Sequence, residues 1–279
     1  MSIVPEQNPH IEISAAVADI IRKWFSGYVA GFKEEGEELR QNIVLKEEHT
    51  GRVCREILQI GKQLDLNDDE LRLAEITALL HDVGRFEQYA RYHTFVDKKS
   101  EDHAELGIKI LRKYGILDQF NEFTRNLIYR TIRYHNQASL PQHETEECLL
   151  FTKLLRDVDK LDIWKVVSDY YHRKDGGRNG ALELDLPDTP EISEQVYRDL
   201  VNQRIVDVKH IRNLNDFKLL QMGWIFDVNF SPTLRSVKSR GYLERIRDVL
   251  PNTEKIRTVY NVVQAYLDHR LSEIQEEVV

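Results

Sequence analysis

The side chains best suited to binding a metal ion in this sequence are histidines and aspartates in its first 160 residues. The segment ALLHDVGRF, from Ala78 to Phe86, places His81 and Asp82 side by side where an apolar run ends before a glycine. Four further candidates lie on either side of this pair: His49, His103, His135 and Asp159. A mixed set of imidazoles and carboxylates suits Mn, Fe, Co, Ni or Zn, whereas Ca²⁺ takes oxygen ligands. The pattern therefore predicts a site for one or two divalent transition-metal ions.

Two such ions would make the site attractive to phosphate. Four neutral imidazoles and two carboxylates would leave a pair of divalent ions with a net charge of about +2 and would lower the pKa of a bound water toward roughly 7. Two ions about 3.5–4 Å apart share a bridging ligand. Asp82 is the natural bridge, because His81 beside it reaches one ion while its second oxygen reaches the other. A single histidine is more often a surface or core residue, so only the combined pattern carries this prediction.

Helical periodicity dominates the elements that must position these residues. Apolar residues recur at helical spacing from residue 15 to 29 and from 37 to 63, and Asn67 resembles a cap before the next apolar face. Further helices are predicted after Ser100 and over residues 118–137, 144–172, 190–205, 211–227, 231–249 and 252–275. Strand patterns are scarce, which predicts an all-α fold. Each candidate ligand lies on a predicted helix or at its end, as a site within a helical bundle requires.

The irregular segment KDGGRNGALELDLPDTP, from Lys174 to Pro190, is rich in Gly, Asp and Pro and predicts a surface loop or a lid. We expect an N-terminal helix over residues 1–36 packing on a metal-binding core over 37–173. A C-terminal helical extension would follow over 174–279. One continuous domain is the alternative.

Composition indicates an ordinary globular protein and argues against some classes of partner. The chain of 279 residues is 41% hydrophobic and 31% charged, with a net charge of −8 and a pI of about 5.7. This balance argues against a nucleic-acid polymer or a membrane as partner. The N-terminus resembles no secretory signal and no apolar run is long enough to cross a bilayer, so we expect a cytoplasmic protein. Association into a homo-oligomer is left open.

The order of the candidate ligands resembles that of the HD superfamily of metal-dependent phosphohydrolases. LLHDVGR matches the superfamily's His-Asp doublet and RDVDKLD matches its final aspartate motif. His103 in DHAELG and His135 in RYHN resemble the two extra histidines of the binuclear subset. The resemblance covers about residues 45–165. It implies an all-helical HD-domain bundle with the doublet at a helix end.

The resemblance also implies how the ligands are shared. His49, His81 and Asp159 would hold one ion, His103 and His135 would hold the other, and Asp82 would bridge them. Asp159 is preferred to Asp157 because the superfamily motif places its ligand directly before Lys-Leu-Asp. Asp157 and Asp162 are expected to face solvent or to orient a histidine.

One position bears on substrate binding. The cyclic-dinucleotide phosphodiesterase branch has a lysine where this chain has Arg85, and its Gly-Tyr-Pro signature is absent here. Arg85 is predicted to grip a phosphate through two donors, or else to form an ion pair with Glu87 or Asp97. The segment from Tyr89 to Lys99 is expected to be a loop over the metals.

The leading functional hypothesis is metal-dependent phosphohydrolysis, with Asp82 and Arg85 as catalytic residues. A metal-bound hydroxide would attack the phosphate ester of a nucleotide or another small phosphorylated metabolite. The alternative is a mixed-valent di-iron oxygenase of the HD type that cleaves a C–C or C–P bond, since the same ligands would serve. A regulatory module without activity is a third class. Downstream, the aromatic and polar residues of QMGWIFDVNFSPTL either bind a ring of the substrate or pack the extension against the core.

Overall fold

The computed structural model describes residues 11–33, 36–173 and 177–276, which form helices and contain no strand. The predicted all-α fold is therefore confirmed. The chain divides into two compact units, residues 1–155 and 156–279. Residues 1–10 of the predicted N-terminal segment lie outside the described residues, and the division at residues 36 and 173 stays a prediction. Within the described ranges, no helix is long and apolar enough to cross a membrane.

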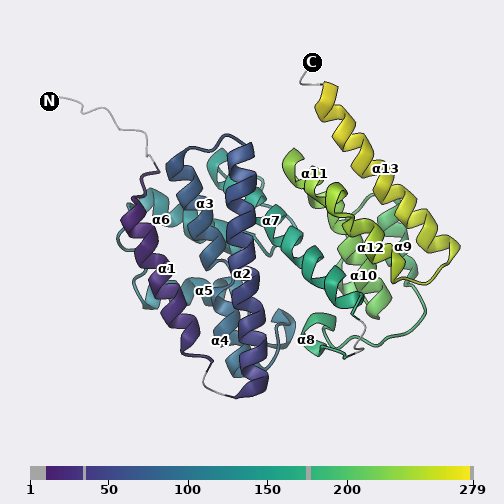
Figure 1. Cartoon of the computed structure of the whole chain (residues 1–279), viewed down its shortest axis with the longest axis horizontal. Helices are drawn as coiled ribbons and strands as arrows, with labels where there is room; N and C mark the ends of the chain where they lie inside the picture. The colour runs from purple at the N-terminus through teal and green to yellow at the C-terminus, as the bar shows by residue number, and fades with distance from the viewer. Residues whose placement is uncertain (1–10, 34–35, 174–176, 277–279) are drawn as a thin grey trace. The chain divides into compact units, whose positions relative to one another are not determined.

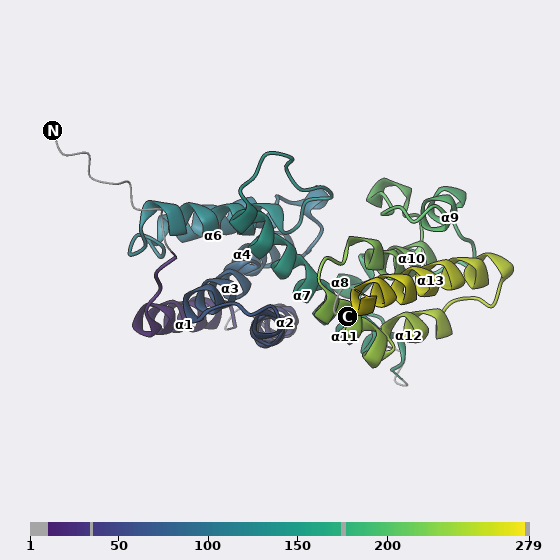
Figure 2. The same ribbon diagram turned by 90° about the horizontal axis from the view of Figure 1, so that it is seen from above.

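The first unit contains the helices that carry most of the candidate ligands (Figure 1). In chain order its elements are α1 (Ala15–Ala30), α2 (Glu37–Gln63), α3 (Asp68–Leu80), α4 (Val83–Tyr92), the 3-10 turn η1 (Asp97–Lys99), α5 (His103–Lys113), α6 (Glu122–Tyr134) and the beginning of α7 (Glu146–Tyr171). Helix α2 packs against α3 and α4, α5 packs against α4 and α6, and α1 packs on α3. Figure 2 looks almost along α2, with α3 beside it.

Buried apolar side chains hold the helices of this unit together. Val53, Ile57 and Ile60 of α2 are fully or almost fully buried, as their helical spacing predicts. A second cluster joins Phe25 of α1 and Ile43 of α2 to aromatic side chains of α4. These contacts place the start of α4, which carries half of the His-Asp doublet, against the middle of α2.

The His-Asp doublet lies at the junction between α3 and α4. Helix α3 begins at Asn67, whose side chain accepts hydrogen bonds from the backbone of residues 69 and 70 while Glu70 bonds back to the Asn67 amide. It ends at Leu80 with His81 as its C-cap, and α4 begins directly after Asp82, which has φ −102° and ψ 14°. The doublet therefore lies at a helix end, as expected from the sequence.

The second unit is also helical and has its own core (Figure 1). After the remainder of α7 its elements are α8 (Gly180–Glu183), α9 (Glu194–Val201), the 3-10 turn η2 (Val208–His210), α10 (Leu214–Gly223), the 3-10 turn η3 (Trp224–Asp227), α11 (Ser231–Arg240), α12 (Tyr242–Asp248) and α13 (Glu254–Glu276). Helix α13 packs against α9, α11 and α12. Trp164 of α7 is fully buried in this core and donates a hydrogen bond from Nε1 to the carbonyl oxygen of Gln221 at 2.8 Å.

The single helix predicted over residues 231–249 is wrong, because Gly241 divides it into α11 and α12. Gly241 has φ 63° and ψ 34°, a left-handed conformation that glycine adopts without the steric cost of a Cβ atom. The predicted irregular segment over residues 174–190 contains the short helix α8, and its residues 174–176 lie outside the described residues.

The close packing of α4 against α5 depends on Gly84. A Cβ atom at this position of α4 would overlap the carbonyl oxygen of His103 and would lie 2.7 Å from the backbone nitrogen of Gly107, both on α5. Neither backbone group can rotate away as a flexible side chain would. Helices α4 and α5 can therefore pack this closely only with glycine at residue 84.

We expect Gly84→Ala to destabilise the protein by roughly 1–3 kcal/mol or more, because it overpacks a backbone contact. Gly27→Ala is the matched control, since a Cβ there would meet nothing within 4 Å. Alanine at residue 27 of α1 should leave stability equal or up to about 1 kcal/mol higher, given its better helix propensity. Urea unfolding of both variants measures the difference. Equal midpoints for the two variants would contradict the close approach of α4 and α5.

Candidate metal centre

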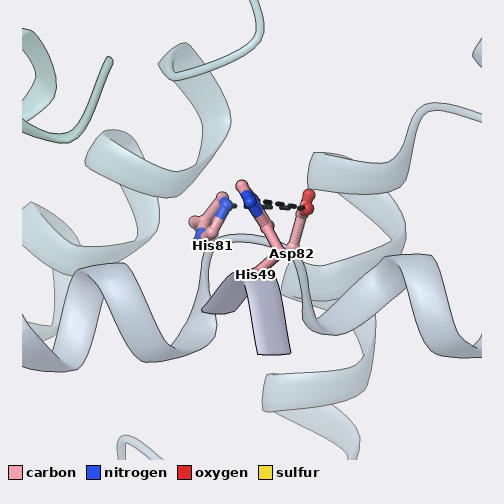
Figure 3. A group of neighbouring side chains, drawn as sticks. All are labelled: His49, His81 and Asp82. Atoms are coloured by element: carbon pink, nitrogen blue, oxygen red, sulfur yellow. Dashed lines mark ion pairs between the residues drawn. The ribbon is translucent and has the colours of Figure 1, made fainter. Parts of the chain in front are cut away.

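The first unit brings five of the six predicted ligands together at the ends or sides of different helices. His49 lies within α2, His81 ends α3, Asp82 precedes α4, His103 is the first residue of α5, and His135 ends α6. All five side chains are buried. Figure 3 shows His49 from α2 beside His81 and Asp82, which come from the junction of α3 and α4. Each of these five side chains therefore lies at the position in a helix that the sequence predicted.

Asp82 faces a different pair of histidines with each of its oxygens. Its Oδ2 lies 3.7 Å from Nε2 of His49 and 3.6 Å from Nε2 of His81. Its Oδ1 lies 3.4 Å from Nε2 of His103 and 4.0 Å from Nε2 of His135. In each group of three, one ligand atom per residue lies within 4.8 Å of the others. This is the geometry of a carboxylate between two cation positions.

In three of the imidazoles, a hydrogen bond at Nδ1 leaves Nε2 as the nitrogen that faces Asp82. Nδ1 of His81 lies 2.6 Å from the carbonyl oxygen of Ala78, and Nδ1 of His135 lies 2.6 Å from that of Ile132. A carbonyl oxygen only accepts hydrogen bonds, so Nδ1 carries the proton in both rings and Nε2 keeps its lone pair. Each contact is to the residue three positions earlier, so the end of the helix itself orients the ring.

The donor atoms fit a bound cation. Burial and the nearby Arg85 lower the pKa of His103 to about 4, so its ring is neutral near pH 7. Its Nδ1 lies 2.8 Å from Oδ2 of Asp97, which leaves Nε2 as the lone-pair nitrogen. That Nε2 is 3.1 Å from Nε2 of His135. A metal ion held by these two nitrogens and Asp82 would accept both lone pairs.

Positive charge keeps the Asp82 carboxylate ionised. Burial opposes ionisation of Asp82, but the positive charges of Lys46 and Arg85 outweigh it and hold the pKa of Asp82 well below its usual range. The Nζ of Lys46 is 2.7 Å from Oδ2, and Nε of Arg85 is 3.5 Å from Oδ1. Sequence reasoning missed Lys46. The available signal was its position one helical turn before His49, on the same side of α2.

Arg85 forms the ion pair with Asp97 that the sequence left as an alternative. Its Nη1 donates to Oδ1 of Asp97 at 2.8 Å, to Oε1 of Gln88 at 2.9 Å and to the carbonyl oxygen of Phe95 at 2.5 Å. Its role as a phosphate clamp stays a prediction. The segment expected as a loop from Tyr89 begins later, because α4 continues to Tyr92.

Asp159 lies on α7 in the second unit, one helical turn past the last residue of the first unit. Its role as a ligand of the ion at His49 and His81 stays a prediction from the motif. The expectation that Asp157 faces solvent or orients a histidine is wrong. Asp157 is fully buried and accepts hydrogen bonds from the backbone and side-chain amides of Asn229 and from the backbone of Phe230.

The aromatic and polar segment after residue 221 belongs to the second unit and packs within it. Trp224 and Phe226 lie against that unit's core. Asp227 accepts from Nη2 of Arg156 at 2.5 Å and pairs with Nζ of Lys160 at 2.7 Å. These contacts support the packing interpretation of the segment, and ring binding stays a hypothesis.

Comparison with known families agrees with this arrangement. The family model of the HD domain matches residues 47–164, which is less than half of the chain. Residues 47–164 are therefore similar to the HD domain. The matched range contains every candidate ligand, from His49 to Asp159. HD domains are typically metal-dependent hydrolases, and the His/Asp cluster is consistent with a metal site. No curated protein and no solved structure matches the chain.

We expect His103→Ala to reduce the metal content from two ions per chain to one, because it removes a ligand from one side of Asp82 and leaves His49 and His81 in place. His143→Ala is the matched control, since His143 is exposed in the same unit. Elemental analysis of protein purified without chelator or affinity tag measures the result. An unchanged metal content in His103→Ala would mean that this histidine is structural only.

Proposed function

We propose that this HD domain binds two divalent transition-metal ions and hydrolyses a phosphate ester of a small molecule. The observation that supports the proposal is the arrangement around Asp82, whose two oxygens each face their own pair of imidazole nitrogens. Hydrolytic sites with two metals need such a shared ligand to keep the ions about 3.5–4 Å apart.

The donor set divides naturally between two ions. His49 and His81, with Asp159 from the HD motif, would hold one ion, and His103 with His135 would hold the other. Nitrogen-rich sets of this kind suit Mn, Fe, Co, Ni or Zn. When bound, two such ions supply positive charge opposite the phosphoryl oxygens and acidity that makes water a nucleophile at neutral pH.

The protein's own residues prepare the site for an anion. The low pKa of Asp82 keeps this carboxylate ionised. It would therefore not retain the proton that the attacking water gives up. The rings of His81, His103 and His135 are held by their Nδ1 contacts, which keep Nε2 of each ring directed toward Asp82. Lys46 and Arg85 add two positive charges beside the carboxylate. Positive charge placed in advance stabilises the charge that develops on a phosphoryl group during transfer.

A small phosphorylated metabolite, such as a nucleotide, is the proposed substrate class. The chain's net charge of −8 disfavours a polyanion, so attraction for phosphate must be concentrated at this centre. A buried centre of this kind accommodates one phosphoryl group rather than an extended backbone.

We expect Lys46→Met to lower kcat/KM by roughly 10–100-fold, the effect of losing one charge-assisted contact with a phosphate. Its metal content should not fall, because removing a cation beside Asp82 does not weaken the binding of another cation. Lys109→Met is the control, since Lys109 is exposed on α5 of the same unit. Steady-state kinetics and elemental analysis on the same preparations measure both quantities. Equal kcat/KM for the two variants would remove Lys46 from the proposed mechanism.

The hydrolysis itself is tested with a panel of nucleoside monophosphates, cyclic nucleotides and aryl phosphate mono- and diesters. Protein loaded with Mn²⁺, Co²⁺, Ni²⁺ or Mg²⁺ should release phosphate or alcohol from at least one class, and Asp82→Asn protein should release none. No turnover across the panel would contradict the proposal. Iron-loaded protein with substrate-dependent uptake of O₂ would instead favour the oxygenase chemistry that the same ligands permit.

A further inference from the structure

A chain of hydrogen bonds connects Arg85 on α4 to the ligand nitrogen of His103 on α5. Arg85 donates to Oε1 of Gln88, Gln88 donates from Nε2 to Oδ1 of Asp97 at 2.9 Å, and Oδ2 of Asp97 contacts Nδ1 of His103 at 2.8 Å. Arg85 also donates directly to Oδ1 of Asp97. All four residues lie in the first unit, and Gln88 is fully buried.

The direction of each bond in this chain is forced by chemistry. A guanidinium has donors only, so the amide oxygen of Gln88 must face Arg85 and its NH₂ group must face Asp97. A carboxylate has acceptors only, so Nδ1 of His103 must carry the proton that Asp97 receives. The lone pair of His103 is then left on Nε2, the nitrogen that faces Oδ1 of Asp82 at 3.4 Å.

Gln88 also holds the segment that carries Asp97. Its Nε2 lies 2.8 Å from Oγ of Ser100 and 2.9 Å from the carbonyl oxygen of Glu101. Arg85 reaches the same segment at the carbonyl oxygen of Phe95. The connection between α4 and α5 is thereby fixed at several points, so Asp97 presents the same oxygen to His103.

We propose that Arg85, Gln88 and Asp97 form a relay that locks His103 in the tautomer with the proton on Nδ1, which makes Asp97 a positioning residue for the second metal ion. Carboxylates that orient a metal-binding histidine typically contribute 10–100-fold to metal affinity. The proposal depends on the proposed function only in taking the centre to bind a second ion. It assigns Arg85 a task that is distinct from contact with a phosphate.

The relay predicts an unusual effect of an isosteric change. In Asp97→Asn one oxygen becomes an NH₂ group. If this NH₂ group faced Arg85 and Gln88, it would meet two other hydrogen-bond donors. It must therefore face His103 instead. It then donates to Nδ1, the ring proton moves to Nε2, and Nε2 can no longer bind a metal ion. An amide in place of a carboxylate beside a histidine is known to hold the ring in the wrong tautomer while leaving the geometry intact.

The test combines a metal-free and a metal-bound measurement on Asp97→Asn. Proton–nitrogen NMR spectra of metal-free, ¹⁵N-histidine-labelled protein report the tautomer, with His103→Ala used to assign the signal. Wild type should show the proton on Nδ1 and Asp97→Asn should show it on Nε2. Calorimetric titration with Mn²⁺ should show second-ion affinity reduced by about 10–100-fold and first-ion affinity unchanged.

The matched control is Asp118→Asn, which makes the same change of charge at an exposed residue of the same unit. The control should keep the wild-type tautomer and both metal affinities. If Asp97→Asn does not fold, Asp97→Ala replaces it, with a mixture of both tautomers expected.

The relay is overturned if Asp97→Asn keeps the proton on Nδ1, or if its second-ion affinity stays within twofold of wild type. A wild-type protein that binds one ion or none would count against the proposed function instead. The tautomer measurement needs neither metal nor substrate, so it decides the relay separately from that result.

Discussion

The structure of the first unit depends on one buried carboxylate. Asp82 is almost completely excluded from solvent, and an ionised group in such a place is costly unless charges and donors surround it. Lys46 contacts one of its oxygens and Arg85 approaches the other. Four imidazoles complete the surroundings, each with Nε2 within 4.0 Å of an oxygen of Asp82. Imidazole nitrogens that converge on a carboxylate in this way are the ligand set expected of a centre that binds transition-metal cations.

Four imidazoles can surround Asp82 only because the helices that carry them end or pass close to it. The junction of α3 and α4 places His81 and Asp82 next to each other without an intervening loop. Gly84 then allows α5 to approach until the backbone of His103 touches α4. The helix ends also supply carbonyl oxygens, at Ala78 and Ile132, that would otherwise seek water. The same backbone groups that terminate the helices thus orient the rings.

The sequence predicted the parts of this centre that depend on local pattern. Helical spacing located α2 through its buried residues, and the His-Asp doublet at the end of an apolar run marked the junction of α3 and α4. Asp97 was considered only as an ion-pair partner of Arg85, and its contact with His103 was not recognisable in the same way, nor were the contacts of Gln88 and Lys46. Each is an ordinary polar residue in sequence, and its importance comes from contacts made across a turn or between helices. The prediction for Asp157 was wrong for a related reason. The backbone amides that donate hydrogen bonds to its carboxylate lie more than 70 residues later in the chain.

Gly241 shows a further limit of predicting helices from the spacing of apolar residues. The apolar positions on either side of it continue at helical spacing, and only the backbone conformation at that residue reveals that the helix is divided. A glycine inside a helical pattern is compatible with a continuous helix and with a break. Packing against α13 favours two short helices here, since both α11 and α12 contact it.

The two cations near Asp82 differ in what they can do when an anion enters. Arg85 donates from Nη1 to three acceptors on two different elements, so moving it would break the connection between α4 and α5. Lys46 contacts Asp82 at the end of a flexible chain and lies over the ring of Phe95, 5.5 Å from its centre. An ammonium on four methylenes can turn toward a new partner at little cost, whereas a guanidinium in a fixed network cannot. A metal ion that binds to Oδ2 of Asp82 would displace the ammonium from that oxygen, and a phosphate brought in by the metal is then its nearest alternative. In the proposed mechanism, Arg85 would hold the ligands in place and Lys46 would be the cation that turns toward the substrate.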